Sequence, residues 1–273
     1  MFNLLRITLL VFVLNFVVAP VAAAEPTNAS SPASALLSTG ESQFQRRQYS
    51  DALQSFQKAL ALFEQSGDLD GEAKALMSIG LVQVDLSGYA DALQSEQKAL
   101  ALFRQQSDRV EEARALLIIG FLQGSHGQET VALQSFERAL ALFQQLGDRD
   151  GEERTLSDIG ITQSRQGDYT VALQTFEQAL ALDRQLHNPD TEAQTLLNIG
   201  SLQRTQNQFS DALQSYRQAL TLFQQVGDQA NAAIAEQRIE KVQSFTSAPL
   251  SPSPTPSASP RPRRPRDRIA LRA

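Results

Sequence analysis

A glycine recurs five times in this chain at a fixed spacing of 40 residues, and this period constrains the fold more than any other feature. The five positions are Gly40, Gly80, Gly120, Gly160 and Gly200. An alanine follows the same period at Ala52, Ala92, Ala132, Ala172 and Ala212. Periods of roughly 20–50 residues are typical of solenoids, in which each repeat buries its hydrophobic face against its neighbours. The chain is therefore predicted to be a stack of similar units.

Each period contains two helical patterns of apolar residues. In the first copy, one pattern comprises Ala52, Phe56, Ala59, Leu60 and Phe63. Their spacing of three and four residues predicts one apolar stripe along a helix. Gly67 is expected to end that helix, because glycine accepts the left-handed conformation of a helix C-terminus. Asp70 is expected to cap the next helix.

The composition supports a helical body and excludes several kinds of site. Of the 11 prolines, only Pro189 lies between residues 33 and 248, and proline interrupts helices. The chain has no cysteine and only 2 histidines, which excludes disulfides, thiolate metal sites and cysteine nucleophiles. The net charge of −6 argues against nucleic-acid binding by the repeat region. No catalytic motif or cofactor-binding motif occurs, so we expect a protein that is not an enzyme.

The repeated residues resemble the tetratricopeptide repeat (TPR) family, in the 40-residue variant of kinesin light chains. The second copy carries Leu76, Gly80, Tyr89, Ala92 and Ala99 in the order typical of that family. The resemblance implies an all-α fold over residues 34–245. That fold would be a right-handed α-solenoid of five helix-turn-helix repeats plus a C-terminal capping helix. It also implies a non-catalytic protein-protein interaction scaffold.

Four positions depart from the family pattern. Glu96 stands where an aromatic residue is expected, and Glu129 replaces the aromatic residue at the corner of the third repeat. His187 and Asn188 replace a Gly-Asp pair, and Pro189 follows them at a predicted helix start. Glu240 stands at the glycine position after the fifth repeat, which predicts a solvated capping helix.

In proteins of this family the first helix of each pair lines a concave groove that binds a peptide or a partner protein segment. The candidate partner-binding residues by this criterion are Met77, Leu81, Val84, Leu117, Phe121, Ile161, Leu197 and Arg204. They change from apolar in the second and third repeats to polar in the fifth. The alternative is that these side chains bury against neighbouring helices.

Three other sets of polar residues have both a functional and a structural interpretation. A glutamine follows each repeat glycine by three residues, at Gln43, Gln83, Gln123, Gln163 and Gln203. These amides could bind a peptide backbone, but we favour a repeated hydrogen bond between helices, because a buried amide needs partners. The acidic segments 68–72 and 148–152 resemble calcium loops, yet helix capping explains them better. His126 and His187 lie in loops of different repeats, without a nucleophile pattern nearby.

The two ends of the sequence differ from the repeats. Residues 1–24 have the features of a secretory signal peptide: Arg6, an apolar run and small residues before Glu25. We expect export to the periplasm or the extracellular space, the alternative being an N-terminal membrane anchor. Residues 25–33 are predicted to be a spacer, and residues 246–273 a disordered basic tail.

The basic tail leaves two alternative functions open. Its arginines, which could contact an anionic surface, are Arg261, Arg263, Arg264, Arg266 and Arg268. The chain could be an architectural, spacer or self-assembly module of the cell envelope, attached through this tail. It could also be an accessory subunit of a separately encoded enzyme.

Overall fold

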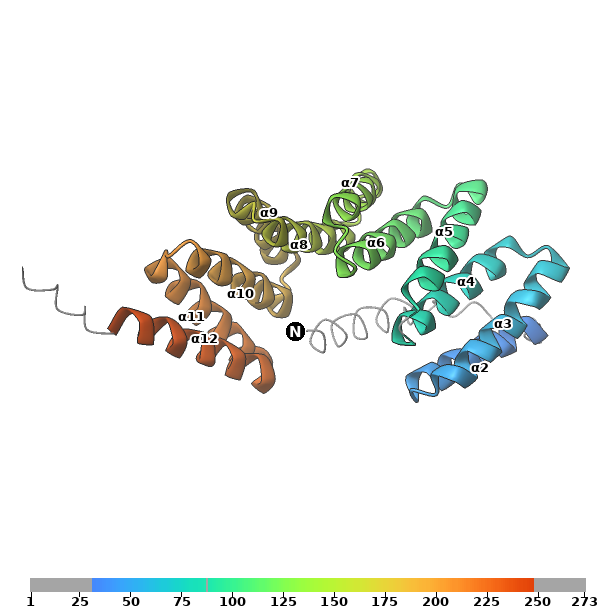
Figure 1. Cartoon of the computed structure of the whole chain (residues 1–273), viewed down its shortest axis with the longest axis horizontal. Coiled ribbons are helices and arrows are strands. Elements are labelled where there is room, and N and C mark those ends of the chain that lie inside the picture. Colours follow the sequence, from blue (N-terminus) through green and yellow to red (C-terminus); the bar gives the residue numbers. More distant parts are fainter. Residues whose placement is uncertain (1–30, 87, 248–273) are drawn as a thin grey trace, which may run out of the picture. The chain divides into compact units, whose positions relative to one another are not determined.

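The protein is described here from a computed structural model, in which residues 31–86 and 88–247 are placed. Throughout these residues the chain forms α-helices joined by short turns (Figure 1). The predicted signal peptide, the predicted spacer up to residue 30 and the tail from residue 248 lie outside the described residues.

The helices alternate in pairs, as the 40-residue period predicts. The first helices of the pairs are α2 (Pro32–Gln45), α4 (Leu69–Asp85), α6 (Arg109–Ser125), α8 (Arg149–Gln166) and α10 (Pro189–Thr205). The second helices are α3 (Tyr49–Ser66), α5 (Tyr89–Gln106), α7 (Glu129–Leu146), α9 (Tyr169–Leu186) and α11 (Phe209–Val226). A final helix, α12 (Gln229–Ser247), follows the fifth pair. The described residues therefore form the predicted α-solenoid of five helix pairs and a capping helix.

The ends of the helices explain the acidic segments between them. Asp68 Oδ1 accepts a hydrogen bond from Gly71 N at 3.0 Å, and Asp148 Oδ1 accepts one from Gly151 N at 2.9 Å. Both carboxylates are thus helix caps, as favoured above. The expected cap at Asp70 was wrong by two residues: Asp70 lies in the first turn of α4 and pairs with Lys74.

Two further helix boundaries depend on local residue chemistry. Pro189 lies in the first turn of α10, where its missing N–H costs nothing, and Asn188 provides the cap. The first helix, α2, begins at Pro32, with Ser31 as its capping residue. The repeat array therefore starts within the segment 25–33 that was expected to be a spacer.

The chain divides into two compact units, residues up to Thr155 and residues from Leu156. In the first unit, α2, α4 and α6 each pack against the second helix of their own pair. The repeat glycines make this contact close: a Cβ at Gly120 would lie 2.7 Å from Phe136 Cδ1. Because real Cβ atoms do not approach so closely, a larger residue would force the helices apart.

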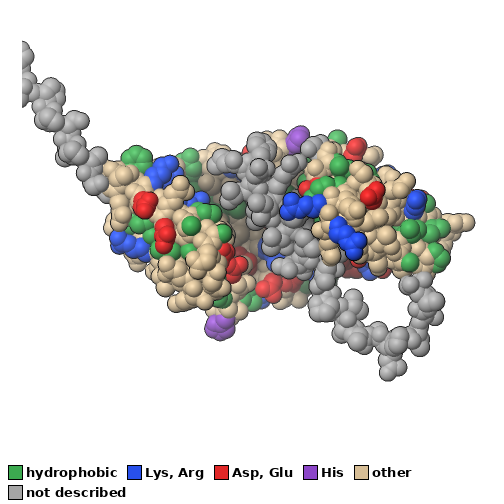
Figure 2. Space-filling view, turned by 90° about the horizontal axis from the view of Figure 1, so that it is seen from below, with side chains coloured by type: hydrophobic (Ala, Val, Ile, Leu, Met, Phe, Trp, Pro, Cys, Tyr) green, Lys and Arg blue, Asp and Glu red, His purple; other side chains and the backbone are tan. Residues whose placement is uncertain are grey.

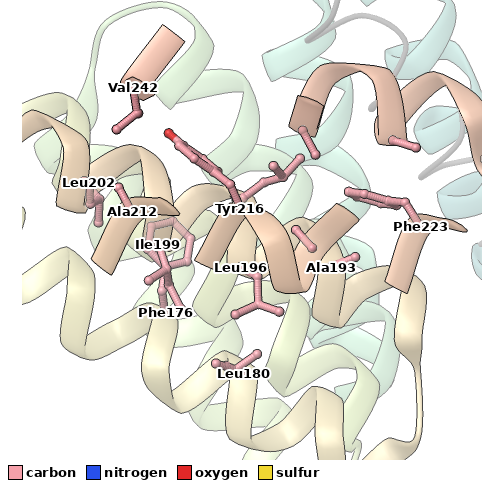
Figure 3. Packing of buried hydrophobic residues seen from close by; sticks show 14 of the residues in the cluster. Phe176, Leu180, Ala193, Leu196, Ile199, Leu202, Ala212, Tyr216, Phe223 and Val242 are labelled. Carbon is pink, nitrogen blue, oxygen red and sulfur yellow. The ribbon is translucent and has the colours of Figure 1, made fainter. Parts of the chain in front are cut away.

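The second unit has one continuous core between α9, α10, α11 and α12 (Figure 3). Phe176, Tyr216 and Phe223 contribute its largest side chains, and each is exposed by 1% or less. Leu196 and Ile199 of α10 pack against these rings. This cluster joins helices of successive repeats, which is how a solenoid buries surface that one pair alone would expose.

Polar residues stand at both ends of the described array. Ile79 of α4 is buried against the preceding helix α3, but the equivalent residue of α2 is the exposed Thr39. Leu196 of α10 is buried, but its equivalent in α12 is the exposed Glu236. Glu240, at the glycine position of α12, is exposed as well, which confirms the prediction of a solvated capping helix.

Candidate functional site

The eight candidate partner-binding residues differ in how far they are exposed. Five of them are half-buried: Met77, Val84, Phe121, Ile161 and Arg204. The other three are buried, with Leu81 exposed by 8%, Leu117 by 1% and Leu197 by 2%. Leu197 belongs to the core cluster of the second unit. Leu117 and Leu197 therefore contribute to the core and offer no surface to a partner.

In the first unit, Met77 and Val84 combine packing with partial exposure. Both contact the small core cluster of Ala92, Ile118 and Leu122. Phe121 lies on α6, one residue after Gly120, and is also half-buried. Met77 and Val84 thus rest on the core cluster, and all three side chains keep part of their apolar surface accessible. Such a surface can bind an apolar side chain of another molecule.

The candidate residues of the second unit are chemically mixed. Ile161 packs against the core cluster and is half-buried, whereas Arg204 is half-buried at the end of α10. The face of the molecule seen in Figure 2 shows small hydrophobic patches between charged and polar side chains. Among these candidate residues, the second unit thus offers one apolar side chain, Ile161, and one cation, Arg204.

The five repeated glutamines are explained by hydrogen bonds within each helix pair. In every repeat a hydroxyl of the second helix donates to the glutamine Oε1 of the first helix. The pairs are Ser55–Gln43 at 2.7 Å, and Ser95–Gln83, Ser135–Gln123, Thr175–Gln163 and Ser215–Gln203, each at 2.8 Å. The favoured structural interpretation is confirmed, and these residues position the helices.

The two histidines occupy different surroundings in different units. His126 stacks on Tyr89, with ring centroids 3.6 Å apart and planes inclined by 4°. The Tyr89 hydroxyl donates a hydrogen bond to Gln128 Oε1 at 3.1 Å. His187 ends α9 in the left-handed conformation, at φ 53°. Neither contact suggests catalysis; the tyrosine–histidine stack joins the corners of two successive repeats.

Glu96 occupies an aromatic core position, as the sequence predicts. Its side chain is fully buried, and a Cβ at Gly80 would lie 2.7 Å from its Oε1. Neither carboxylate oxygen has a hydrogen-bond partner among residues 31–86 and 88–247. Burial therefore raises the pKa of Glu96 well above its ordinary value.

Asp183 is another fully buried acid, and the sequence did not single it out. It stands where the other repeats carry Phe63, Phe103, Phe143 and Phe223. Its Oδ2 accepts a hydrogen bond from Thr195 Oγ1 at 2.9 Å, and burial raises its pKa. Alignment of the five copies against one another would have revealed both the acid and its threonine partner.

Other features bear on possible cofactors and membranes. Among the described residues, no group of three or more histidine, aspartate or glutamate side chains could hold a metal ion. No helix within 31–86 and 88–247 is long and apolar enough to cross a membrane.

Comparison with models of protein families shows which family the repeats belong to. The family model described as Tetratricopeptide repeat matches residues 32–105, 111–185 and 152–225. This chain belongs to the tetratricopeptide repeat family. Comparison with curated proteins gave no match.

Several solved TPR-like structures are similar to this chain in fold. The apo form of RapI matches with a TM-score of 0.59 and 15% identity, over 81% of this chain and 85% of that chain. BtubC (BKLC) from P. vanneervenii matches with a TM-score of 0.59 and 16% identity, over 82% and 84%. The Rap conjugation gene regulator of plasmid pLS20, in complex with a Phr peptide, matches with a TM-score of 0.58 and 16% identity, over 83% and 68%. At these identities the similarity supports the fold alone.

Proposed function

We propose that this TPR protein is a non-catalytic scaffold whose first helices bind a peptide or a segment of a partner protein. The observation that carries the proposal is the half-buried apolar surface of Met77, Val84 and Phe121 on α4 and α6. An apolar surface that remains accessible on a folded protein commonly marks an interaction site. We further propose that the repeats are of the 40-residue kinesin-light-chain-like variant.

The differences between repeats support this choice of surface. Residues that pack the helices, such as the glycine and the Gln–Ser pair, are nearly the same in every copy. The position after the glycine instead reads Leu81, Phe121, Ile161 and Ser201. Because the residue at this position differs between repeats, the surface that it helps to form can differ along the array to suit a ligand, since function depends on the site rather than the fold.

One of the similar structures suggests a class of ligand for the proposed binding surface. The plasmid-encoded Rap regulator was solved with a bound peptide, and it shares the helical repeat fold of this chain. A peptide is therefore a reasonable first class of ligand to test here. A partner protein that presents an extended or helical segment would offer the same chemistry.

Affinity capture with paired variants tests the proposal. Phe121→Ala and Met77→Ser should weaken capture of a bound protein from an envelope fraction, because both remove accessible apolar surface. Val131→Ser is the matched control, since Val131 is a 44% exposed residue on the second helix α7. Equal capture by all three folded variants would refute binding through the first helices.

Export of the protein is a separate proposal, based on the features of residues 1–24. N-terminal sequencing of the mature protein should then begin at Glu25. A chain that keeps Met1 and fractionates with membranes would support the anchored alternative.

End-to-end self-assembly of the array is the less favoured function. If the end of one array stacked on the start of another, Thr39 and Glu240 would be buried between them. Internal repeats carry an isoleucine at the position of Thr39 and a glycine at the position of Glu240. Burying an unpaired carboxylate is costly, so these ends favour a single array with solvated termini.

A further inference from the structure

Glu96 stands at the contact between α4 and α5, close to residues that carry the proposed function. A Cβ at Gly80 of α4 would lie 2.7 Å from Glu96 Oε1, and the Glu96 side chain is fully buried. Met77 precedes Gly80 by three residues and Val84 follows it by four, so both lie about one turn from it on α4. A movement of α4 away from the carboxyl would therefore move both apolar residues.

The helix pair leaves this carboxyl without a hydrogen bond from the neighbouring hydroxyl. The hydroxyl of Ser95 donates to Gln83 Oε1 at 2.8 Å instead. The other fully buried acid at an aromatic position, Asp183, differs, because its Oδ2 accepts a hydrogen bond from Thr195 Oγ1 at 2.9 Å. Burying an ionised carboxylate without partners is costly. The ionised form of Glu96 therefore favours separation of α4 from α5, which would let water reach it.

The charged residues of the packed helices lie away from the Glu96 carboxyl. Helix α5 packs against α4 and α6. Positions one turn either side of Glu96 on α5, and of Gly80 on α4, hold no charged residue, and neither does the segment 115–125 of α6. Arg104 is eight residues from Glu96, about 12 Å along α5, and it pairs with Glu112 of α6.

The full set of titratable and charged side chains on these helices agrees with this separation. Besides Glu96, they are Asp70, Glu72, Lys74 and Asp85 on α4, Tyr89, Asp91, Lys98 and Arg104 on α5, and Arg109, Glu111, Glu112 and Arg114 on α6, with His126 at its end. Burial is accordingly the cause that raises the pKa of Glu96.

Met77 and Val84 also depend on α5 for their position. Both pack against a cluster that contains Ala92 of α5 together with two residues of α6. Ala92 precedes Glu96 by four residues, so the two lie on the same face of α5. Separation of α4 from α5 around Glu96 would therefore take Met77 and Val84 off this cluster.

We propose that Glu96 is a pH-sensitive switch between α4 and α5: loss of its proton opens this helix pair and displaces Met77 and Val84, which weakens partner binding. Burial raises the pKa of Glu96 in the closed pair, whereas water would return it towards its ordinary value in an open pair. The closed pair therefore keeps a proton that the open pair releases. Opening becomes easier as the pH rises from the ordinary pKa through the raised one. This inference rests on the proposed function and adds a means of regulating the same surface.

Hydrogen–deuterium exchange of the full chain measures the opening without a ligand. The exchange rate of α4 and α5 is divided by that of α7 at each pH, because the chemical exchange rate of every amide rises with pH in the same way. Helix α7 is the reference because it carries Phe136 at the position of Glu96. We expect the ratio to rise at least about tenfold from pH 5 to pH 8. A constant ratio would overturn the proposal.

Non-ionisable variants show whether Glu96 is responsible. Glu96→Gln keeps the shape of the side chain, and its exchange ratio should be the same at both pH values. Glu96→Phe supplies the ring found in the other pairs and keeps the test informative if the amide destabilises the pair. Asp91→Asn is the matched control, because Asp91 is exposed on the same helix and its loss changes the net charge equally. This control should retain the pH dependence, and retention by both Glu96 variants would contradict the switch.

Oxidation of Met77 by hydrogen peroxide reports the displacement directly. Met77 is the only methionine besides Met1, so mass spectrometry can follow it alone. Because oxidation follows exposure of the thioether, its rate relative to Glu96→Gln should rise at least about twofold from pH 5 to pH 8. An unchanged relative rate would mean that α4 keeps its position, and the proposal would fail.

Partner capture separates this inference from the proposed function. A protein whose capture depends on Phe121 should be captured about tenfold less at pH 8 than at pH 5, relative to Glu96→Gln. Capture that is weakened by Phe121→Ala but shows no such pH dependence would overturn the switch and leave the proposed function standing. If Phe121→Ala leaves capture unchanged, the proposed function fails, and regulation of binding fails with it even where α4 and α5 separate.

Discussion

Replacing the buried Glu96 by phenylalanine should stabilise the protein. In the other four pairs the ring of Phe56, Phe136, Phe176 or Tyr216 faces the repeat glycine, whereas Gly80 faces the Glu96 carboxyl. The helix pair α4 and α5 therefore has the small residue that an aromatic ring requires. Glu96→Phe should fill this position in the same way.

The size of the effect follows from two contributions. Burying a phenylalanine side chain gains roughly 1.5–3 kcal/mol, and removing a buried polar group without partners relieves about 1–3 kcal/mol. Allowing for imperfect repacking, we expect the free energy of unfolding to rise by about 2 kcal/mol. For a domain of this size that corresponds to a melting temperature higher by roughly 4–8 °C.

The gain should depend on pH. Burial raises the pKa of Glu96 in the folded state, so folding favours the protonated acid. The contribution of Glu96 to the free energy of unfolding is therefore present at low pH. It is lost as the pH rises from the ordinary pKa of the carboxyl through its raised pKa in the folded protein. The advantage of Glu96→Phe over the wild type should therefore be larger at pH 8 than at pH 5. Glu96→Gln, which cannot ionise, should lose the same pH dependence.

Thermal unfolding followed by circular dichroism at both pH values measures these effects. Gln97→Phe is the matched control, because residue 97 is exposed on the same helix and a ring there should add little. A lower melting temperature for Glu96→Phe at both pH values would refute the reasoning. It would mean that the carboxyl is partnered in solution or that the site is too small for a ring.

Three further substitutions test the packing of the repeats by chemical denaturation. Gly120→Ala places a Cβ 2.7 Å from the Phe136 ring and should cost about 1–3 kcal/mol, and an unchanged midpoint would contradict the close helix approach. Ser135→Ala leaves the buried Gln123 amide without its donor and should cost about 1–2 kcal/mol, whereas removing both partners should cost less than the two single losses combined. Asp68→Ala removes a helix cap and should cost about 1 kcal/mol, with Asp68→Asn retaining most of the stability.

The fold could be predicted from the sequence because one packing solution is repeated five times. The spacing of glycine and alanine marks where helices approach, and the Gln–Ser pairs recur wherever the same geometry recurs. A single copy would not have distinguished a structural hydrogen bond from a ligand contact. Five equivalent hydrogen bonds whose lengths agree within 0.1 Å favour the structural role.

The candidate site was predicted less well, because exposure depends on neighbours that change from repeat to repeat. Leu117 and Met77 occupy the same repeat position, yet Leu117 is buried and Met77 is half-buried. Met77 and Val84 of α4 rest on a cluster of residues from α5 and α6, and only the fold brings these three helices together.

Because the polar residues stand only at the two ends of the array, the array can be lengthened or shortened by whole internal repeats. An internal block of 40 residues can be duplicated or deleted while Thr39 of α2 and Glu236 of α12 remain at the ends. Removing α12 alone would instead uncover Tyr216 and Phe223, which it helps to bury. Changes in length by whole repeats should therefore be tolerated, while a cut inside a repeat should produce an aggregating chain.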